Sequence, residues 1–177
     1  MRLIYKHVLI SKLTLAVIGF FWLPAQAHLM EAQQGTLNII DDGAFMVLSL
    51  PISAFEDIDD NKDGTVSMVE FNNHRSTIIE SVKTRITLSD NEGNIPLEGV
   101  MLSPEVAHDT SAGFISQLVV LGRFALVETN RPLRFNNGLY GQHEAEQVVK
   151  ITATRQADGK KHIFELTPEL SSIDLKC

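Results

Sequence analysis

The twelve residues at positions 59–70 constrain this chain more than any other segment. They read D-D-N-K-D-G-T-V-S-M-V-E, with oxygen-bearing residues at every second position as far as Ser67 and a glycine in sixth place. A hard divalent cation takes six to eight oxygen ligands at about 2.3–2.6 Å, so alternate side chains must turn toward one point. Gly64 permits the sharp turn that carries the backbone around that point. The segment therefore predicts a calcium-binding turn.

This spacing resembles the calcium loop of the EF-hand superfamily, over about residues 50–82 of the chain. The resemblance implies a Ca²⁺ ion held by Asp59, Asn61, Asp63, the backbone carbonyl of Thr65, Ser67 directly or through water, and both carboxylate oxygens of Glu70. Two alternatives stay open. One is a solvated acidic turn, because Asp, Asn and Gly all favour turns. The other is a loop that keeps the EF-hand shape but binds calcium weakly.

Helices are expected on both sides of this loop. Residues 68–83 place Phe71, Ile78, Ile79 and Val82 at helical spacing, with polar residues on the other side. A short helix is expected over residues 51–58, because proline is favoured in the first helical turn. The sequence thus predicts a helix-loop-helix EF-hand inserted at residues 50–82.

The loop has no counterpart elsewhere in the sequence. Residues 90–98 are the nearest candidate, but they lack the spacing and contain Pro96. EF-hands usually pair, so a lone hand departs from the family pattern and argues against a calmodulin-like sensor. The missing partner is expected to be the β-domain itself, the same hand in a second subunit through self-association, or an unidentified protein.

Strand-like segments dominate the rest of the chain. Residues 36–41 and 44–50 flank Asp42-Gly43, a strong hairpin signal. Further strands are expected at residues 84–89, 97–102 and 114–128, the last with a bulge or kink at Gly122, and at 146–155 and 161–166, which form a second hairpin. About seven short strands separated by turns predict an α+β, mostly β, sandwich-like fold. Residues 28–177 are expected to form one domain that carries the EF-hand insertion.

The first 27 residues predict a secretory signal peptide. Three basic residues precede the apolar stretch at residues 13–23, and Ala25 and Ala27 are the small residues that a cleavage site needs. The apolar stretch is shorter than the about 20 residues that a membrane-spanning helix requires. We therefore expect an exported protein, periplasmic or secreted, that starts at His28 and has no membrane span once the signal is removed.

Charge and cysteine content narrow the function. The signal holds three of the 15 basic residues and none of the 22 acidic ones. Residues 28–177 therefore carry 12 basic and 22 acidic residues, a formal charge of −10. Such a charge repels nucleic acid and anionic membranes and favours cations. Cys177 is the one cysteine, so an internal disulfide is excluded and the fold must rest on its core or on a metal.

Other constellations carry less chemistry. If His28 is the first residue after cleavage, its α-amine and imidazole together could bind copper. A frayed terminus without a ligand is the favoured interpretation. His143 begins a motif similar to that of zinc proteases, yet Gln147 stands where the second ligand is needed, and residues 136–138 and Gly141 suggest a loop. Serine or cysteine nucleophile signatures do not appear, and carboxylate pairs stay open because their pairing is spatial. We expect a protein that is not an enzyme.

A weaker resemblance covers residues 28–177. It rests on His28, the early hairpin, a lone EF-hand followed by His74-Arg75, and a late strand pair ending in FELTPE at residues 164–169. This pattern resembles the extracytoplasmic N-terminal region of HupE/UreJ-like bacterial membrane proteins, a family that continues into membrane helices. It implies a free-standing periplasmic module. Two functions follow: an exported calcium-binding protein whose ion braces the β-domain, or a partner-binding module associated with metal handling or transport, with calcium structural only.

Overall fold

The computed structural model describes residues 31–107, 113–127 and 131–175. The described elements are β1 (Gln34–Ile40), β2 (Gly43–Pro51), η2 (Ile52–Ala54), α2 (Met68–Arg85), β3 (Ile86–Asp90), β4 (Gly93–Ile95), β5 (Leu97–Val106), β6 (Ile115–Ala125), β7 (Leu133–Asn137), η3 (Glu144–Glu146), β8 (Val149–Arg155), β9 (Lys161–Leu166) and β10 (Ser172–Leu175). The fold is mostly β, as the sequence predicts, and α2 is the one α-helix among the described residues.

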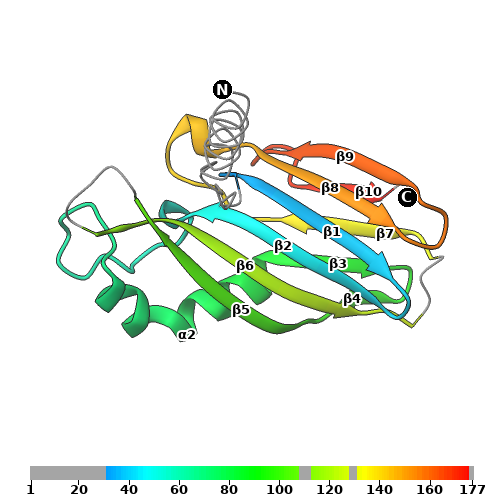
Figure 1. Cartoon of the computed structure of the whole chain (residues 1–177), viewed down its shortest axis with the longest axis horizontal. Helices are drawn as coiled ribbons and strands as arrows, with labels where there is room; N and C mark the ends of the chain where they lie inside the picture. The colour runs from blue at the N-terminus through cyan, green and yellow to red at the C-terminus, as the bar shows by residue number, and fades with distance from the viewer. Residues whose placement is uncertain (1–30, 108–112, 128–130, 176–177) are drawn as a thin grey trace, which may run out of the picture.

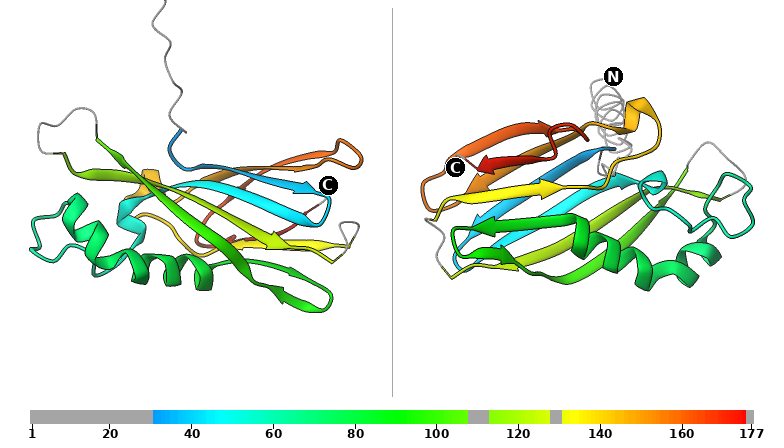
Figure 2. Two further views of the ribbon diagram at one scale, coloured as in Figure 1. Left: turned by 60° about the horizontal axis from the view of Figure 1, so that its bottom comes forward. Right: turned by 180° about the vertical axis from the view of Figure 1, so that it is seen from behind.

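The strands form two sheets that lie one over the other (Figure 1). The larger sheet has six strands in the order β5-β6-β2-β1-β8-β9, and the smaller has four in the order β10-β7-β3-β4. Neighbours are antiparallel except β1 and β8, which run parallel. From behind, α2 leads directly into β3, so helix and small sheet together cover one face of the large sheet (Figure 2). This arrangement is sandwich-like.

One hydrophobic core joins these layers. Along β1 the side chains alternate between half-buried and buried, which places Leu37 and Ile39 inside and Thr36 and Asn38 on the open face. From the other layer, α2 contributes Phe71, Ile78 and Val82, and the small sheet contributes Leu88 and Phe135. The helix is therefore held by tertiary packing of one apolar face.

Both predicted hairpins are present. The β1–β2 pair places Ile40 opposite Gly43, so the turn residues are Asp41 and Asp42 rather than the predicted Asp42 and Gly43. Asp41 itself adopts the positive φ of 48°, a conformation that aspartate tolerates better than most residues. The β8–β9 pair has the predicted boundaries at its C-terminal strand and a shorter first strand.

Other boundaries differ from the prediction. The described part of the chain holds ten strands rather than about seven, and Asn136 and Asn137, expected in a loop, lie in β7. The helix extends to Arg85, so β3 begins at Ile86 instead of Thr84. The bulge expected at Gly122 lies opposite it in β5, between Glu98 and Met101, and not in β6.

The helix predicted over residues 51–58 is wrong. Only the single 3-10 turn η2 forms there, because Phe55 returns to extended backbone and Asp57 takes a φ of 58°. Phe55 and Ile58 are both buried, so burial of these two side chains overrides the helical preference of the segment. The helix-loop-helix expected of an EF-hand is thus a 3-10 turn, a loop and one α-helix.

The predicted signal peptide at residues 1–27, His28 and Cys177 lie outside the described residues. Within them, no helix combines the length and apolarity needed to cross a membrane.

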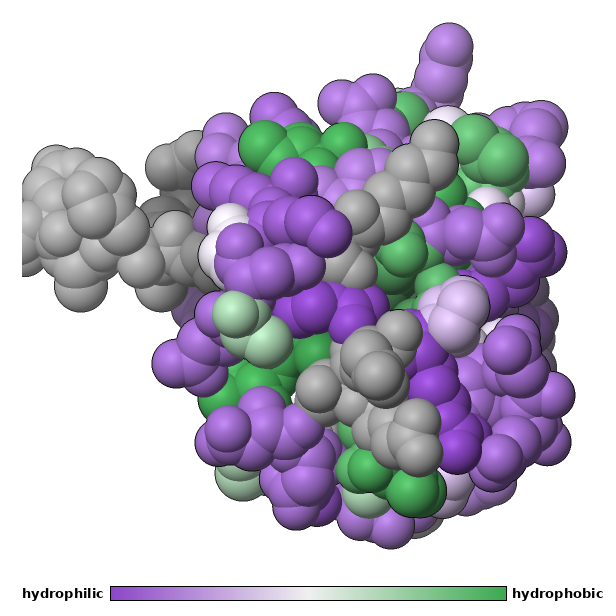
Figure 3. All heavy atoms as spheres, turned by 90° about the vertical axis from the view of Figure 1, so that its right-hand side faces the viewer, coloured by the Kyte–Doolittle hydropathy of each residue, from purple (hydrophilic) through white to green (hydrophobic). Residues whose placement is uncertain are grey.

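The end of the sandwich that holds the β1–β2 and β8–β9 turns is mainly hydrophilic on its surface (Figure 3).

Candidate metal site

The predicted calcium loop leaves the core at Ile58 and returns to it at Val66, both of which are buried. Between them the backbone turns sharply, with φ of 58° at Lys62 and 82° at Gly64. Glycine adopts a positive φ without steric cost, so Gly64 is suited to this place as the sequence predicts. The loop is therefore a tight excursion anchored at both ends.

Side-chain oxygens in the first half of the loop accept hydrogen bonds from the loop's own amides. The Gly64 N–H donates to Asp59 Oδ2 at 2.9 Å, and the Asp63 N–H donates to Asn61 Oδ1 at 2.9 Å. Asp63 Oδ1 accepts the Thr65 N–H at 2.9 Å and the Thr65 hydroxyl at 2.7 Å. Four of the predicted ligand residues, Asp59, Asn61, Asp63 and Thr65, are thus brought together around one turn.

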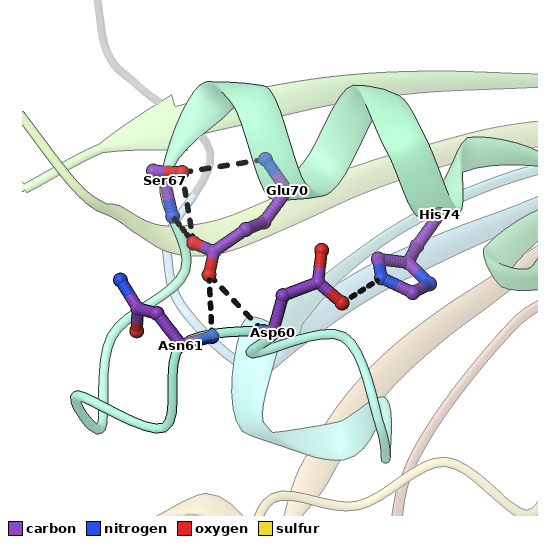
Figure 4. Close-up of polar contacts among 5 residues, drawn as sticks. All are labelled: Asp60, Asn61, Ser67, Glu70 and His74. Atoms are coloured by element: carbon purple, nitrogen blue, oxygen red, sulfur yellow. Dashed lines mark hydrogen bonds and ion pairs between the residues drawn. The ribbon is translucent and has the colours of Figure 1, made fainter.

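The other two predicted ligands form the start of α2. Ser67 is the N-cap, and its hydroxyl accepts the Glu70 N–H at 3.3 Å, while Glu70 Oε2 accepts the Ser67 N–H and hydroxyl at 2.8 Å each. Glu70 Oε1 accepts the N–H groups of Asp60 at 3.1 Å and Asn61 at 3.4 Å (Figure 4). Glu70 therefore ties the helix start to the first half of the loop.

These hydrogen bonds also favour negative charge. The backbone and hydroxyl of Ser67 lower the pKa of Glu70, and the hydroxyl and backbone of Thr65, with Asn61, lower the pKa of Asp63. Both carboxyl groups thus stay ionised at neutral pH. The predicted metal ligands of the loop are all oxygen atoms, which are the ligands that calcium prefers.

The arrangement is nevertheless not a closed cluster of acidic ligands. Among the residues that the structure describes, no group of three Asp, Glu, His or Cys side chains is placed to hold a metal ion. Both oxygens of Glu70 already accept hydrogen bonds from protein donors. The predicted ligands are of the chemical type that binds calcium. To bind an ion with both oxygens, Glu70 must give up hydrogen bonds that it makes in the structure.

One contact of the loop was not predicted. Val66 forms an isolated antiparallel bridge with Ile115, whose N–H donates to the Val66 carbonyl at 2.8 Å. Strand β2 accompanies β6 only as far as the pair of Pro51 and Gln117, so Val66 joins β6 just beyond the end of that pairing. Sequence reasoning missed this contact because a single bridge between distant segments leaves no periodic pattern.

A second unpredicted contact joins loop and helix. His74 Nε2 lies 2.7 Å from Asp60 Oδ1, and the two side chains face each other across the gap between helix and loop (Figure 4). His74 is one turn beyond Glu70, so the helix holds the first half of the loop at two successive turns.

The histidine motif at residue 143 has a different structure from a zinc-protease helix. Residues 144–146 form the single turn η3, and Glu146 Oε2 accepts the Ser53 hydroxyl at 2.6 Å. The same carboxylate oxygen accepts the His143 N–H at 3.4 Å. Glu146 thus fastens this segment to η2.

Comparison with known proteins adds no relative: no protein-family model matches the chain, and the search of curated proteins found no match.

Proposed function

We propose that this chain is an exported, non-enzymatic calcium-binding protein in which the ion orders the loop at residues 59–70 and braces the β-domain. The bridge between Val66 and Ile115 carries the proposal, because it connects the middle of the loop to a strand of the six-stranded sheet. An ion that fixes the loop would thereby fix the adjoining end of that sheet.

The ligands we assign are Asp59, Asn61, Asp63, the Thr65 carbonyl, Ser67 and Glu70. Calcium accepts six to eight oxygens in flexible geometry, which this set supplies. The bond between Ile115 and Val66 supports the β-domain, rather than a second hand, as the structural partner of the loop.

We expect weak binding by the standard of cytosolic sensors. The set holds three carboxylates, and Glu70 must release the Asp60 and Asn61 amides before it can give both oxygens to an ion. A 3-10 turn replaces the first helix, so less rigid structure holds the loop entrance. These features favour a dissociation constant on the order of 0.1–1 mM, in the range of extracellular modules.

Calorimetric titration of the protein without residues 1–27 tests this proposal. We expect calcium to bind at one site, and the heat of binding to be much smaller when magnesium is titrated instead. Ion at ten times its Kd adds about 1.4 kcal/mol to stability and raises Tm by roughly 3–6 °C. Glu70→Gln, which removes the charge and the two-oxygen ligand, should abolish both effects.

The matched control is Glu80→Gln, which removes one carboxylate from an exposed position on the same helix. It should keep the calcium heat and the Tm shift. The proposal fails if the wild-type protein gives no saturable heat, or if Glu70→Gln binds as the wild type does.

A second function is favoured by a cleft of about 620 Å³ beside the loop. It is a partner-binding periplasmic module associated with metal handling or transport, in which calcium is structural only. The cleft is considered next.

A further inference from the structure

The cleft lies between four segments that are far apart in the sequence. Its walls come from η2 and the residues after it, the calcium loop, the start of β6, and residues 142–146. Its volume of about 620 Å³ falls within the range of pockets that hold a drug-sized ligand, about 300–1,000 Å³, and therefore has room for one long side chain with its neighbouring backbone.

The lining combines an apolar base with acidic side chains. Phe55, Ile58, Val66 and Ile115 contribute to the lining although each is mostly buried in the core. The charged residues of the lining are four carboxylates and one cation, namely Glu56, Asp57, Asp59, Glu146 and Lys62. Both the charge of the cleft and that of the whole chain, −7 with the signal included, favour a cationic ligand.

One wall of the cleft is fixed in place by close packing. Glu146 is held by the Ser53 hydroxyl at 2.6 Å, and Gln142 N–H donates to the same hydroxyl at 3.3 Å. A Cβ atom at Gly141 would lie 2.3 Å from Glu146 Oε2 and 2.8 Å from Pro51 Cγ, so only glycine fits there. The Glu146 carboxylate therefore keeps its position beside the cleft without an added ligand.

We propose that this cleft binds an extended, cationic segment of a protein partner through a lysine or arginine side chain. Such a side chain joins an apolar stem to a charged head, so the stem contacts the apolar base while the head reaches the carboxylates. The cleft shares Asp59 and Thr65 with the proposed calcium ligands, but its other three carboxylates lie outside that set, so the proposal does not require an occupied loop.

Fluorescence anisotropy with labelled peptides tests the proposal on the protein without residues 1–27. The probe is the hexapeptide Gly-Leu-Arg-Leu-Arg-Gly, compared with versions in which glutamine or glutamate replaces both arginines. All titrations are made in chelator, so that failure of the calcium proposal leaves the result unaffected. We expect saturable binding of the arginine peptide, at least tenfold weaker binding of the glutamine peptide, and no binding of the glutamate peptide.

Two pairs of variants separate the cleft from general charge attraction. Glu56→Gln with Asp57→Asn removes two cleft carboxylates, and asparagine tolerates the positive φ at position 57. We expect at least fivefold weaker binding of the arginine peptide. The control pair, Glu98→Gln with Glu165→Gln, removes the same charge from exposed positions outside the cleft and should change binding less than twofold.

The second pair adds a cation. Gln142→Lys places it in the cleft lining, whereas Gln156→Lys places it on an exposed turn elsewhere, with the same change in net charge. Only the first should weaken binding, again at least fivefold, and this pair decides the matter if the Glu56/Asp57 variant does not fold. The proposal is overturned if the arginine peptide does not bind, if the glutamate peptide binds equally well, or if cleft and control variants lose affinity alike.

Discussion

Glu70 has one role in the structure and, under the calcium proposal, a second role that competes with the first. In the structure its carboxylate joins the Ser67 cap to the amides of Asp60 and Asn61, and it is almost fully buried. The role assigned by the calcium proposal uses the same two oxygens. If the loop binds calcium as we propose, its stability without the ion and its affinity for the ion are coupled through this one residue.

Ser67→Ala should destabilise the protein in chelator. The substitution removes the hydroxyl that accepts the Glu70 N–H and donates to its carboxylate. Loss of a serine N-cap costs about 1 kcal/mol, which lowers Tm by a few degrees. Thermal melts followed by circular dichroism measure this. Ser76→Ala, at an exposed position of the same helix, should change stability by less than about 0.5 kcal/mol, and equal effects of the two would contradict the assigned cap.

Asp90 should contribute to stability that is lost in acid. The Glu92 N–H donates to Asp90 Oδ1 at 2.8 Å, and this bond, followed by Arg131, lowers the pKa of Asp90 below its usual value of 3.8. Because the folded pKa lies below the unfolded one, the contribution is present above about pH 4 and disappears as the pH falls through the folded pKa.

Asp90→Asn keeps the acceptor oxygen but cannot titrate, so its stability should depend less on pH between about pH 4 and 2. Urea unfolding at several pH values gives this slope. Identical slopes for the variant and the wild type would show that the Asp90 contacts do not persist in solution.

Among the elements, α2 and the strands that alternate clearly were predictable, and the reason is periodicity. The helix begins at Met68 as expected, because its apolar residues recur at helical spacing after a capping serine. Strands β4, β7 and β10 were missed because they are three, five and four residues long, too short for a reliable alternation. The positions of the candidate ligands followed from the loop spacing, whereas the Val66 bridge and the cleft depend on which distant segments meet.

The bridge between loop and β6 makes a prediction about hydrogen exchange. If calcium fixes the loop, the Ile115 amide, which donates to Val66, should exchange more slowly with the ion present. At ten times the Kd the expected slowing is about tenfold. Site-resolved exchange measured by NMR tests this, with a central amide of β8 such as that of Ile151 as the unaffected internal reference.

Unchanged exchange at Ile115 on calcium addition, in a protein that calorimetry shows to bind the ion, would mean that the ion does not brace the sheet. The same experiment on Glu70→Gln should show no effect of calcium at either amide.

At the level of the whole molecule, the core is shared by both sheets and the helix. Such sharing favours cooperative unfolding, in which no layer melts alone. The chain without residues 1–27 retains Tyr140 as its single tyrosine and contains no tryptophan. Tyr140 packs against the core near the small sheet, so its fluorescence reports one region while circular dichroism reports all strands.

Urea unfolding followed by Tyr140 fluorescence and by far-ultraviolet circular dichroism should therefore give one midpoint. Two separate midpoints would show that the small sheet unfolds independently of the large one. Phe135→Ala, which leaves a cavity at a fully buried position in the small sheet, should lower the free energy of unfolding by about 3–5 kcal/mol. The midpoints from fluorescence and circular dichroism should then fall together.

The parallel pairing of β1 with β8 limits how early the large sheet can be completed during folding. β1 lies inside the large sheet, between β2 and β8, and its Gln34 is paired with Lys150, more than one hundred positions later. Closing so long a stretch of chain makes folding slow, because the entropy is lost before the pairing contributes. The large sheet is therefore incomplete until β8 and β9 have been synthesised. If the chain is exported as we propose, this delay keeps it open while it crosses a membrane.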